Sequence, residues 1–188
     1  MAEVKVLVAG YTSADSKAKD GIERTCATIT LIRDREINMV VDPGLLKDKK
    51  ILVDALAKEG LKPEDINYIG LTHSHADHFA NIGLFPNAKL LEFFGIWYED
   101  MVDDWKEEFT KDIKIIKTPG HANTSISFIV NTSMGKVAVV GDVYWKENYP
   151  PEDPYADNAK ELAKSRKEIL SVADYIVPGH AGMFKVKK

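Results

Sequence analysis

Apolar residues along the chain fall mainly into short runs, and their length and composition predict β-strands. Strands are expected in the segments EVKVLVAG (3–10), CATITLIRDREINMVVDPG (26–44), KPEDINYIGLT (62–72), AKLLEFF (88–94), IKIIKTPGH (113–121), SISFIVNT (125–132), KVAVVGD (136–142) and DYIVPGH (174–180). The second segment contains two strands, which are joined by a polar turn around residues 34–36.

Two other segments show the spacing of an amphipathic helix. The segment LLKDKKILVDALAKEG (45–60) is expected to form a helix that ends at Gly60. Its apolar face consists of Ile51, Leu52, Ala55 and Leu56. The apolar side of the second helix consists of Ala159, Leu162, Ala163, Ile169, Leu170 and Ala173. Strand runs interrupted by two helices, without a break in composition, predict one α+β domain over residues 1–188, with helices covering the sheet layers.

The segment EFFGIWYEDMVDDWKEEF (92–109) is both aromatic and acidic. Its large side chains recur at a spacing that predicts one face of a helix, made of Phe94, Trp97, Tyr98, Met101 and Trp105. Such a face usually packs against a core or a second subunit, so a homo-oligomer contact through 92–109 is one expectation. The alternative is a lid over a substrate pocket.

Composition restricts the class of protein. Apolar residues make up 45% of the chain and charged residues 29%, with no run as long as a membrane span, so we expect a cytoplasmic globular protein without a membrane segment. The opening MAEVKVLVAG predicts a first strand and not a secretion signal. The single cysteine, Cys26, fits a reducing compartment and is expected to be buried as a small apolar residue. A net charge of −4 does not support nucleic-acid binding, although a local patch leaves it open.

Three of the five histidines of the chain lie in one short loop. In LTHSHADHFANIG (71–83), His73, His75, Asp77 and His78 directly follow an apolar run. Side chains alternate along an extended segment, so the first three can point the same way, whereas His78 needs the start of a helical turn. Such a loop can offer two imidazoles to one ion, and a carboxylate with an imidazole to another. These ligands suit zinc, iron or manganese.

The other two histidines, His121 and His180, each follow a predicted strand in a Pro-Gly-His turn. A lone histidine is usually structural, but five of five in such turns indicate metal ligands. Asp142 follows Gly141 at the end of a strongly apolar strand, where a carboxylate is costly unless something pairs with it. By itself this residue could be a turn or helix-cap aspartate. Beside five histidines, it is better explained as a bridge between two cations.

Four motifs resemble those of the metallo-β-lactamase superfamily in their order and spacing: HSHADH (73–78), TPGH (118–121), GD (141–142) and PGH (178–180). The segment SRKEILSVADYIVPGH (165–180) also resembles the small, single-domain members of that superfamily. The resemblance implies a four-layer αββα sandwich, in which two sheets carry helices on their outer faces and the metals lie at one sheet edge.

The same resemblance implies a role for each candidate ligand. By position, His73, His75 and His121 hold the first metal, Asp77, His78 and His180 hold the second, and Asp142 bridges the two. Asp42, in VVDPG, occupies a position where members of the superfamily often have a supporting aspartate. We expect it either to orient a ligand histidine or to be a plain turn residue.

Two zinc ions, with iron or manganese as alternatives, can hold a hydroxide between them and stabilise the charge that develops during hydrolysis. Because all five histidines serve as ligands, none remains as a general base. The proton for the leaving group is then expected from a bound water, from Asp77 or from an unplaced neighbour such as Tyr144. The sequence therefore predicts a metal-dependent hydrolase of an ester, thioester, lactone or phosphodiester, with a small-molecule substrate favoured.

Two other activities stay open at this point. A mononuclear iron dioxygenase acting on a persulfide would use only a His-His-carboxylate set, here His73, His121 and Asp142. An RNA phosphodiesterase is the other alternative, but the acidic stretch in 92–109 would repel a polyanion if it lined the site. A binding protein with an inactive site would need a missing ligand, and none is missing. The loop NYPPEDPYAD (148–157) is either a rim of the site or an ordinary connector.

Overall fold

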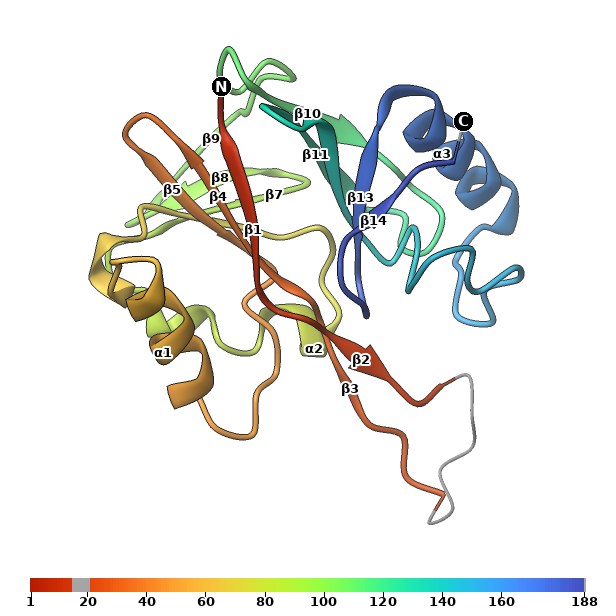
Figure 1. Cartoon of the computed structure of the whole chain (residues 1–188), viewed down its shortest axis with the longest axis horizontal. Helices are drawn as coiled ribbons and strands as arrows, with labels where there is room; N and C mark the ends of the chain where they lie inside the picture. Colours follow the sequence, from red (N-terminus) through yellow and green to blue (C-terminus); the bar gives the residue numbers. More distant parts are fainter. Residues whose placement is uncertain (15–20, 188) are drawn as a thin grey trace.

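Two β-sheets face each other and carry helices on their outer sides in the computed structural model, which describes residues 1–14 and 21–187 (Figure 1). The larger sheet has the order β1 (Glu3–Val8), β4 (Ile29–Asp34), β5 (Ile37–Val41), β6 (Tyr68–Gly70), β7 (Lys89–Glu92), β8 (Gly95–Tyr98) and β9 (Met101–Asp103). The smaller has the order β10 (Ile113–Lys117), β11 (Ile126–Thr132), β12 (Gly135–Gly141), β13 (Tyr175–Pro178) and β14 (Phe184–Lys185). A separate pair consists of β2 (Tyr11–Thr12) and β3 (Thr25–Cys26).

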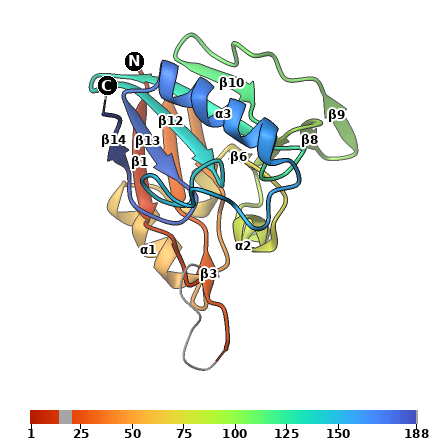
Figure 2. The same cartoon turned by 90° about the vertical axis from the view of Figure 1, so that its right-hand side faces the viewer.

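The helices complete the expected αββα sandwich. They are α1 (Lys50–Lys58), α2 (Ala76–Phe79) and α3 (Ala159–Val172), with short 3-10 helices at Pro63–Asp65 and Ile82–Leu84. In Figure 1, α1 lies beside the larger sheet and α3 beside the smaller one, and Figure 2 shows α3 crossing the outer face of β12 and β13. The predicted fold class is confirmed.

Alternating side chains on the strands separate the apolar interior into three layers. On β11, Phe128 and Val130 face the cluster between the two sheets, whereas Ile129 belongs to the cluster under α3. On β5, Val41 contributes to the central cluster and Val40 to the cluster under α1. This period of two is what the apolar strand segments predicted, and it lets both faces of each sheet be covered.

Both predicted helices form, and their ends have identifiable causes. Gly60, with a φ of +72°, follows α1, where a left-handed conformation suits glycine. The side chain of Asn158 caps α3 by accepting hydrogen bonds from the backbone N–H groups of Lys160 and Glu161. Leu52 is buried under α1 as predicted, but Ile51, at the margin of the same face, is half exposed.

The predicted helix over 92–109 is wrong. The segment forms the hairpin of β8 and β9, in which Tyr98 pairs with Met101 across a two-residue turn, and Glu99 has a φ of +52°. Aromatic residues favour strands, and Gly95 tolerates the close approach of Asp103 on the neighbouring strand. The aromatic spacing was compatible with either element over so short a stretch. No residue of 92–109 is among the described residues that line the pocket identified below, so the segment is not its lid.

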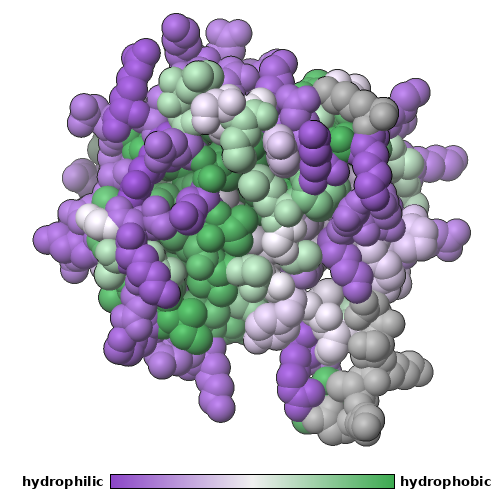
Figure 3. Space-filling view, in the orientation of Figure 1, coloured by the Kyte–Doolittle hydropathy of each residue, from purple (hydrophilic) through white to green (hydrophobic). Residues whose placement is uncertain are grey.

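The surface mixes apolar and hydrophilic side chains. Figure 3 shows an apolar area near the centre of the face that carries β1 and α1, with hydrophilic side chains around it. Among the helices within residues 1–14 and 21–187, none combines the length and the apolar character needed to cross a membrane.

One edge of the sandwich collects the ends of parallel strands. Strand β5 runs parallel to β6, and β12 runs parallel to β13, while β10 and β12 both run antiparallel to β11. The carboxyl ends of these strands therefore lie at corresponding edges of their sheets. The residues that follow these ends carry the side chains described next.

Candidate metal centre

The structure brings all seven predicted ligands together. His73 and His75 follow β6, Asp77 and His78 lie in α2, His121 follows β10, Asp142 follows β12, and His180 follows β13. His78 turns into the site because α2 starts at Ala76, the change of direction that its position in the loop required. Their side chains form two neighbouring groups in which every candidate ligand atom lies within 4.8 Å of the others in its group.

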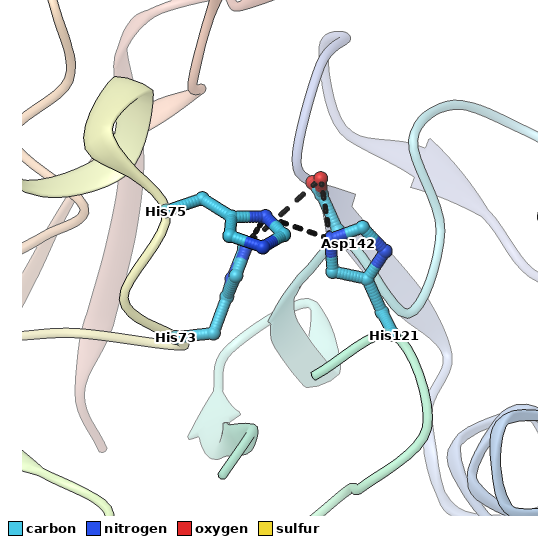
Figure 4. A group of neighbouring side chains, drawn as sticks. All are labelled: His73, His75, His121 and Asp142. Carbon is cyan, nitrogen blue, oxygen red and sulfur yellow. Dashed lines mark hydrogen bonds and ion pairs between the residues drawn. The ribbon is translucent and has the colours of Figure 1, made fainter. Parts of the chain in front are cut away.

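The first group contains His73, His75, His121 and Asp142 (Figure 4). The Nδ1 atom of His75 lies 3.0 Å from Nε2 of His73 and 3.0 Å from Nε2 of His121. The Oδ2 atom of Asp142 lies 3.4 Å from Nε2 of His121 and 4.0 Å from Nε2 of His73. Three imidazoles and one carboxylate thus converge from three separate turns, a donor set that suits zinc.

The second group contains Asp77, His78 and His180. The Nε2 atom of His180 lies 3.7 Å from Oδ2 of Asp77, and His78 is fully buried beside it. The Oδ1 atom of Asp142 lies 3.1 Å from Nε2 of His180 and 3.4 Å from Nε2 of His78. The Oδ2 atom also lies 3.2 Å from Nε2 of His180, so the carboxylate of Asp142 contacts His121 of the first group and both histidines of the second.

Four of the histidines have their outward Nδ1 atom occupied by a hydrogen-bond partner. His78 contacts Asp42 at 2.9 Å, His121 contacts Asp153 at 2.7 Å, and His180 contacts the carbonyl oxygen of Cys26 at 3.1 Å. An acceptor at Nδ1 favours the tautomer that carries the proton there, which leaves the Nε2 lone pair directed into the site.

His73 completes this pattern through a relay. Thr72 donates its hydroxyl proton to Asp42, so its oxygen remains free to accept from Nδ1 of His73 at 3.1 Å. Asp42 also accepts a hydrogen bond from the backbone N–H of Thr72. Asp42 thus contacts one candidate ligand, His78, directly and a second, His73, through Thr72, as the orienting hypothesis requires.

The residues present fit a pair of cations. Within the described residues, His78 Nε2 and Asp142 Oδ1 are buried and have no hydrogen-bond partner. Leaving a buried polar atom without a partner costs about 1–3 kcal/mol, so two such atoms facing each other call for another group between them. A divalent cation, which takes a lone pair from each, meets that requirement.

The electrostatics of the site favour an ionised carboxylate surrounded by histidines. Burial raises the pKa of Asp142, but His78 and His180 lower it more, so the carboxyl pKa lies well below its ordinary value. Burial lowers the pKa of His73, and neighbouring His78 adds to that effect, whereas Asp42 and Asp142 hold the pKa of His78 above its ordinary value despite burial. The same pocket therefore stabilises Asp142 as an anion and His73 as a neutral donor.

Glycines allow the turns to approach one another. A Cβ added at Gly179 would lie 1.8 Å from Oδ1 of Asp142, and one added at Gly141 would lie 2.1 Å from Oγ1 of Thr72. Gly141 also has a φ of +50°, a conformation that favours glycine. The glycines of the Gly-Asp and Pro-Gly-His motifs thus make room for the carboxylate that lies between the two groups.

The site opens into a cavity of about 350 Å³. Its floor is formed by His75, Asp77, His121, Asp142 and His180, and its walls by Thr12, Ala14, Glu23, Thr25, Trp145 and Tyr155. Of the wall residues, Thr12 and Thr25 lie in β2 and β3, Ala14 and Glu23 flank these strands, and the last two follow β12. The loop 148–157 therefore contributes a wall residue, Tyr155, and is a rim of the pocket.

Sequence reasoning missed two partners of the candidate ligands. Asp153, whose side chain has no exposed surface, contacts His121, and Thr25 donates its hydroxyl proton to Asp77 at 2.7 Å. Both lie in short segments without an apolar pattern, and only the Pro-rich setting of Asp153 marked its loop as a possible rim. Cys26 is fully buried, as expected.

The suggestion that Tyr144 protonates the leaving group is wrong. Its ring belongs to the apolar cluster under α3, and its hydroxyl donates to the carbonyl oxygen of Arg166. Tyr144 is 7% exposed and is not among the residues that line the cavity. Successive residues of an extended chain point in opposite directions, so Trp145, the next residue, faces the pocket instead.

A His/Asp cluster at the edge of an αββα sandwich is the arrangement of a metal-dependent hydrolase. The family model described as "Metallo-beta-lactamase superfamily" matches residues 27–92, which include the histidine-rich loop. "Metallo-beta-lactamase domain-containing protein 1" of Xenopus laevis is 30% identical over 98% of this chain and 82% of its own length. The protein of the same description from Rattus norvegicus is 35% identical over 93% of this chain and 70% of its own length. The chain therefore belongs to the metallo-β-lactamase superfamily, as a metal-dependent hydrolase.

More distant matches include lactonases and solved structures. An "N-acyl homoserine lactonase" of Bacillus cereus is 29% identical over 68% of this chain and 60% of its own length. A crystal structure of a metallo-β-lactamase candidate from Thermotoga maritima superposes with a TM-score of 0.78 at 22% identity, covering 98% of this chain and 99% of the other. An N-acyl homoserine lactone hydrolase with the product N-hexanoyl-L-homoserine at its catalytic metal centre gives a TM-score of 0.69 at 18% identity, over 95% and 92% of the two chains.

Proposed function

We propose that the protein is a two-metal hydrolase of a small, uncharged ester, thioester or lactone. One observation carries this proposal. The carboxylate of Asp142 approaches both histidine groups: Oδ1 lies 3.4 Å from Nε2 of His78, and Oδ2 lies 3.4 Å from Nε2 of His121 and 3.2 Å from Nε2 of His180. A carboxylate placed in this way can bridge two cations, which is the arrangement used to activate water in two-metal hydrolases.

The candidate ligands divide into two sets around that bridge. His73, His75 and His121 would hold one ion, and Asp77, His78 and His180 the other, with Asp142 shared between them. When bound, such a pair of cations would lower the pKa of a water between them. Their positive charge would also stabilise the oxyanion that develops during hydrolysis. Zinc fits this mixture of imidazole and carboxylate, and iron and manganese are the alternatives.

The polar residues of the chain hold the ligands in place before a substrate arrives. Asp42, Asp153 and the carbonyl oxygen of Cys26 each occupy the outward nitrogen of a ligand histidine. These contacts keep the imidazole rings from rotating, so little reorganisation is needed during the reaction.

Ester hydrolysis breaks the bond between the carbonyl carbon and the leaving atom, and the leaving atom takes up a proton from water. We assign the transfer of this proton to Asp77, whose carboxylate lines the cavity and accepts a hydrogen bond from Thr25. The hydroxyl of Thr25 fixes the orientation of that carboxylate. No described histidine is available for the role, because all five belong to the two groups.

The charge of the cavity supports an uncharged substrate. Glu23 lies at its wall and Asp77 at its floor, and none of the described residues that line it is a lysine or an arginine. Apart from the two cations themselves, a polyanion such as RNA would meet no cationic side chain among those described lining residues. The likeness to lactonases, one of which holds the product N-hexanoyl-L-homoserine, also supports an acyl substrate of modest size.

Metal content combined with a substrate panel tests this proposal. We expect about two zinc ions per chain by elemental analysis. We also expect the zinc-loaded protein to hydrolyse a lactone, an oxygen ester or a thioester faster than a phosphodiester. Asp142→Ala is the comparison variant. Because it lacks the shared carboxylate, it should bind less zinc and hydrolyse these substrates more slowly than the parent.

Two other results would replace the proposal. About one iron per chain, with oxygen uptake on a persulfide, would establish a dioxygenase that uses His73, His121 and Asp142. Faster cleavage of an RNA phosphodiester than of any acyl substrate would establish a nuclease.

A further inference from the structure

The two walls of the cavity are joined at its mouth. On one wall, the loop after β12 carries Tyr155, and on the other, the segment before β3 carries Glu23. The hydroxyl of Tyr155 donates a hydrogen bond to Oε2 of Glu23 at 3.1 Å. These two residues are 132 positions apart in the sequence, so the bond joins distant parts of the chain across the pocket.

Both walls are also attached to the candidate metal ligands at their base. Asp153 contacts His121 through Oδ2 and accepts the backbone N–H of Tyr155 through Oδ1, at 2.7 and 2.9 Å. On the opposite wall, Thr25 donates to Asp77. The Asp153 contact is buried and charge-assisted, whereas the Tyr155–Glu23 bond is exposed to solvent. The rim bond is therefore the contact that opens most readily, because exposed hydrogen bonds compete with water.

Tyr155 lies over Trp145. The two rings stack with centroids 5.8 Å apart and an angle of 21° between their planes, and Tyr155 is 54% exposed while Trp145 is 3% exposed. The indole also lies edge-on to the ring of His180, with the centroids 6.4 Å apart. Trp145, which lines the cavity, therefore contacts both an exposed residue of the rim and a candidate ligand.

The indole N–H of Trp145 is buried and has no hydrogen-bond partner within the described residues. An unpaired buried donor is unfavourable, and an acceptor brought in by a ligand would relieve it. An oxygen of a bound substrate is such an acceptor, and an apolar acyl chain can pack against the indole ring.

We propose that Tyr155 and Glu23 form a clasp over Trp145 that sets the size of the acyl group accepted by the site. With the clasp closed, the cavity holds a short acyl group. A longer acyl chain reaches Trp145 only when the Tyr155–Glu23 hydrogen bond is broken. The free energy of breaking that bond therefore lowers kcat/KM for long substrates. This inference rests on the proposed function for its substrate class, and on the contacts between the two walls for the clasp itself.

Fluorescence quenching tests the clasp without any assay of activity. The chain has three tryptophans, so a zinc-loaded chain carrying Trp97→Phe and Trp105→Phe reports on Trp145 alone. In that background, Tyr155→Phe and Glu23→Ala should each raise the acrylamide quenching constant about twofold or more, because each removes one hydrogen bond and leaves the stacked ring or the backbone intact. Glu23→Gln keeps an acceptor oxygen and should stay closer to the parent. Unchanged quenching in both Tyr155→Phe and Glu23→Ala would overturn the clasp.

The matched control is Tyr11→Phe. Tyr11 is 53% exposed, close to the 54% of Tyr155, and lies in β2 near the same wall, but it does not line the cavity. Removing its hydroxyl should leave quenching of Trp145 unchanged.

Selectivity between long and short acyl chains tests whether the clasp sets the size of the accepted acyl group. The ratio of kcat/KM for p-nitrophenyl octanoate to that for p-nitrophenyl acetate should rise about two- to tenfold in Tyr155→Phe, the range expected from one hydrogen bond. Trp145→Phe, which keeps an aromatic ring but loses the N–H, should raise KM for the octanoate more than it lowers kcat. Hydrolysis of both esters with an unchanged ratio would overturn the role in selectivity. If no variant hydrolyses any ester, the proposed function fails, and quenching alone decides whether the clasp exists.

Discussion

The carboxylate of Asp153 lies 2.7 Å from Nδ1 of His121, and neither side chain is more than 2% exposed. The two residues are 32 positions apart and come from different turns at the same edge of the sandwich. A carboxylate that accepts the outward proton of a ligand histidine fixes the ring and increases the electron density on its inward nitrogen. Asp153 therefore takes part in metal binding without being one of the seven predicted ligands.

We predict that Asp153→Ala lowers the affinity for zinc by about 10- to 100-fold, the range typical of partners that orient ligand histidines. Competition with a chromophoric chelator measures this affinity. Asp153→Asn, whose amide oxygen can still accept from His121, should recover part of the loss. The exposed neighbour Glu152 provides the control, because Glu152→Ala removes a carboxylate from the same loop without touching a candidate ligand. Equal zinc affinity in Asp153→Ala and the parent would contradict the assigned role.

Gly179 offers a test of the bridging carboxylate that leaves every candidate ligand in place. An added Cβ would lie 1.8 Å from Oδ1 of Asp142, so Gly179→Ala must displace that oxygen or the turn that follows β13. We expect binding of a second zinc ion to weaken by at least about tenfold, because the shared carboxylate can no longer contact both groups. Isothermal titration with zinc resolves the two binding steps.

The control for this variant is Gly182→Ala. Gly182 lies three residues further along the chain, and an added Cβ there meets no atom within 4 Å. Its zinc titration should match that of the parent. Two unchanged binding steps in Gly179→Ala would show that Asp142 does not need its observed position.

The sandwich could be predicted because its strands carry a strong signal. Val137 and Val139 face the central cluster while Ala138 and Val140 face α3. A short continuous run of apolar residues such as this one is typical of a strand that is buried on both faces. The candidate ligands were recognisable for a different reason. Imidazoles and carboxylates that directly follow apolar strands are costly without a partner, so their clustering in the sequence indicates a shared ligand.

Other features left too little trace in the sequence. Strands β2 and β3 have two residues each, and no apolar run marks them in the sequence. Only their pairing in the folded chain identifies them as strands. The segment 92–109 has a spacing compatible with a helix, yet the turn at Glu99 and the pairing of Trp97 with Val102 make it a hairpin. Asp153 lies in a loop whose conformation is set by tertiary contacts, so no local pattern could identify its partner His121.

The variant Asp142→Ala tests whether this carboxylate is needed for metal binding and turnover more than for folding. We predict that Asp142→Ala lowers occupancy of the second metal below about half and lowers turnover by at least about 100-fold, because its carboxylate lies within 3.4 Å of His121 in the first group and of His78 and His180 in the second. The metal-free variant should melt below the metal-free parent, because His78 and His180 lose a buried counter-charge, but it should still unfold cooperatively, since Asp42 continues to pair with His78. Wild-type turnover in this variant would refute the bridging assignment.

Removal of metal should lower thermal stability as well as activity. Among residues 1–14 and 21–187, Asp142 Oδ1 and His78 Nε2 find no hydrogen-bond partner, so a cation that binds these atoms only in the folded state stabilises the fold by mass action. At a free zinc concentration about 1,000 times the dissociation constant, the gain is about 4 kcal/mol. For a chain of this size that corresponds to a rise in Tm of about 8–16 °C. Scanning calorimetry of chelator-treated protein before and after adding zinc measures the shift, and Asp142→Ala should show a smaller one. An identical Tm with and without zinc would mean that the two groups hold no cation in the folded protein.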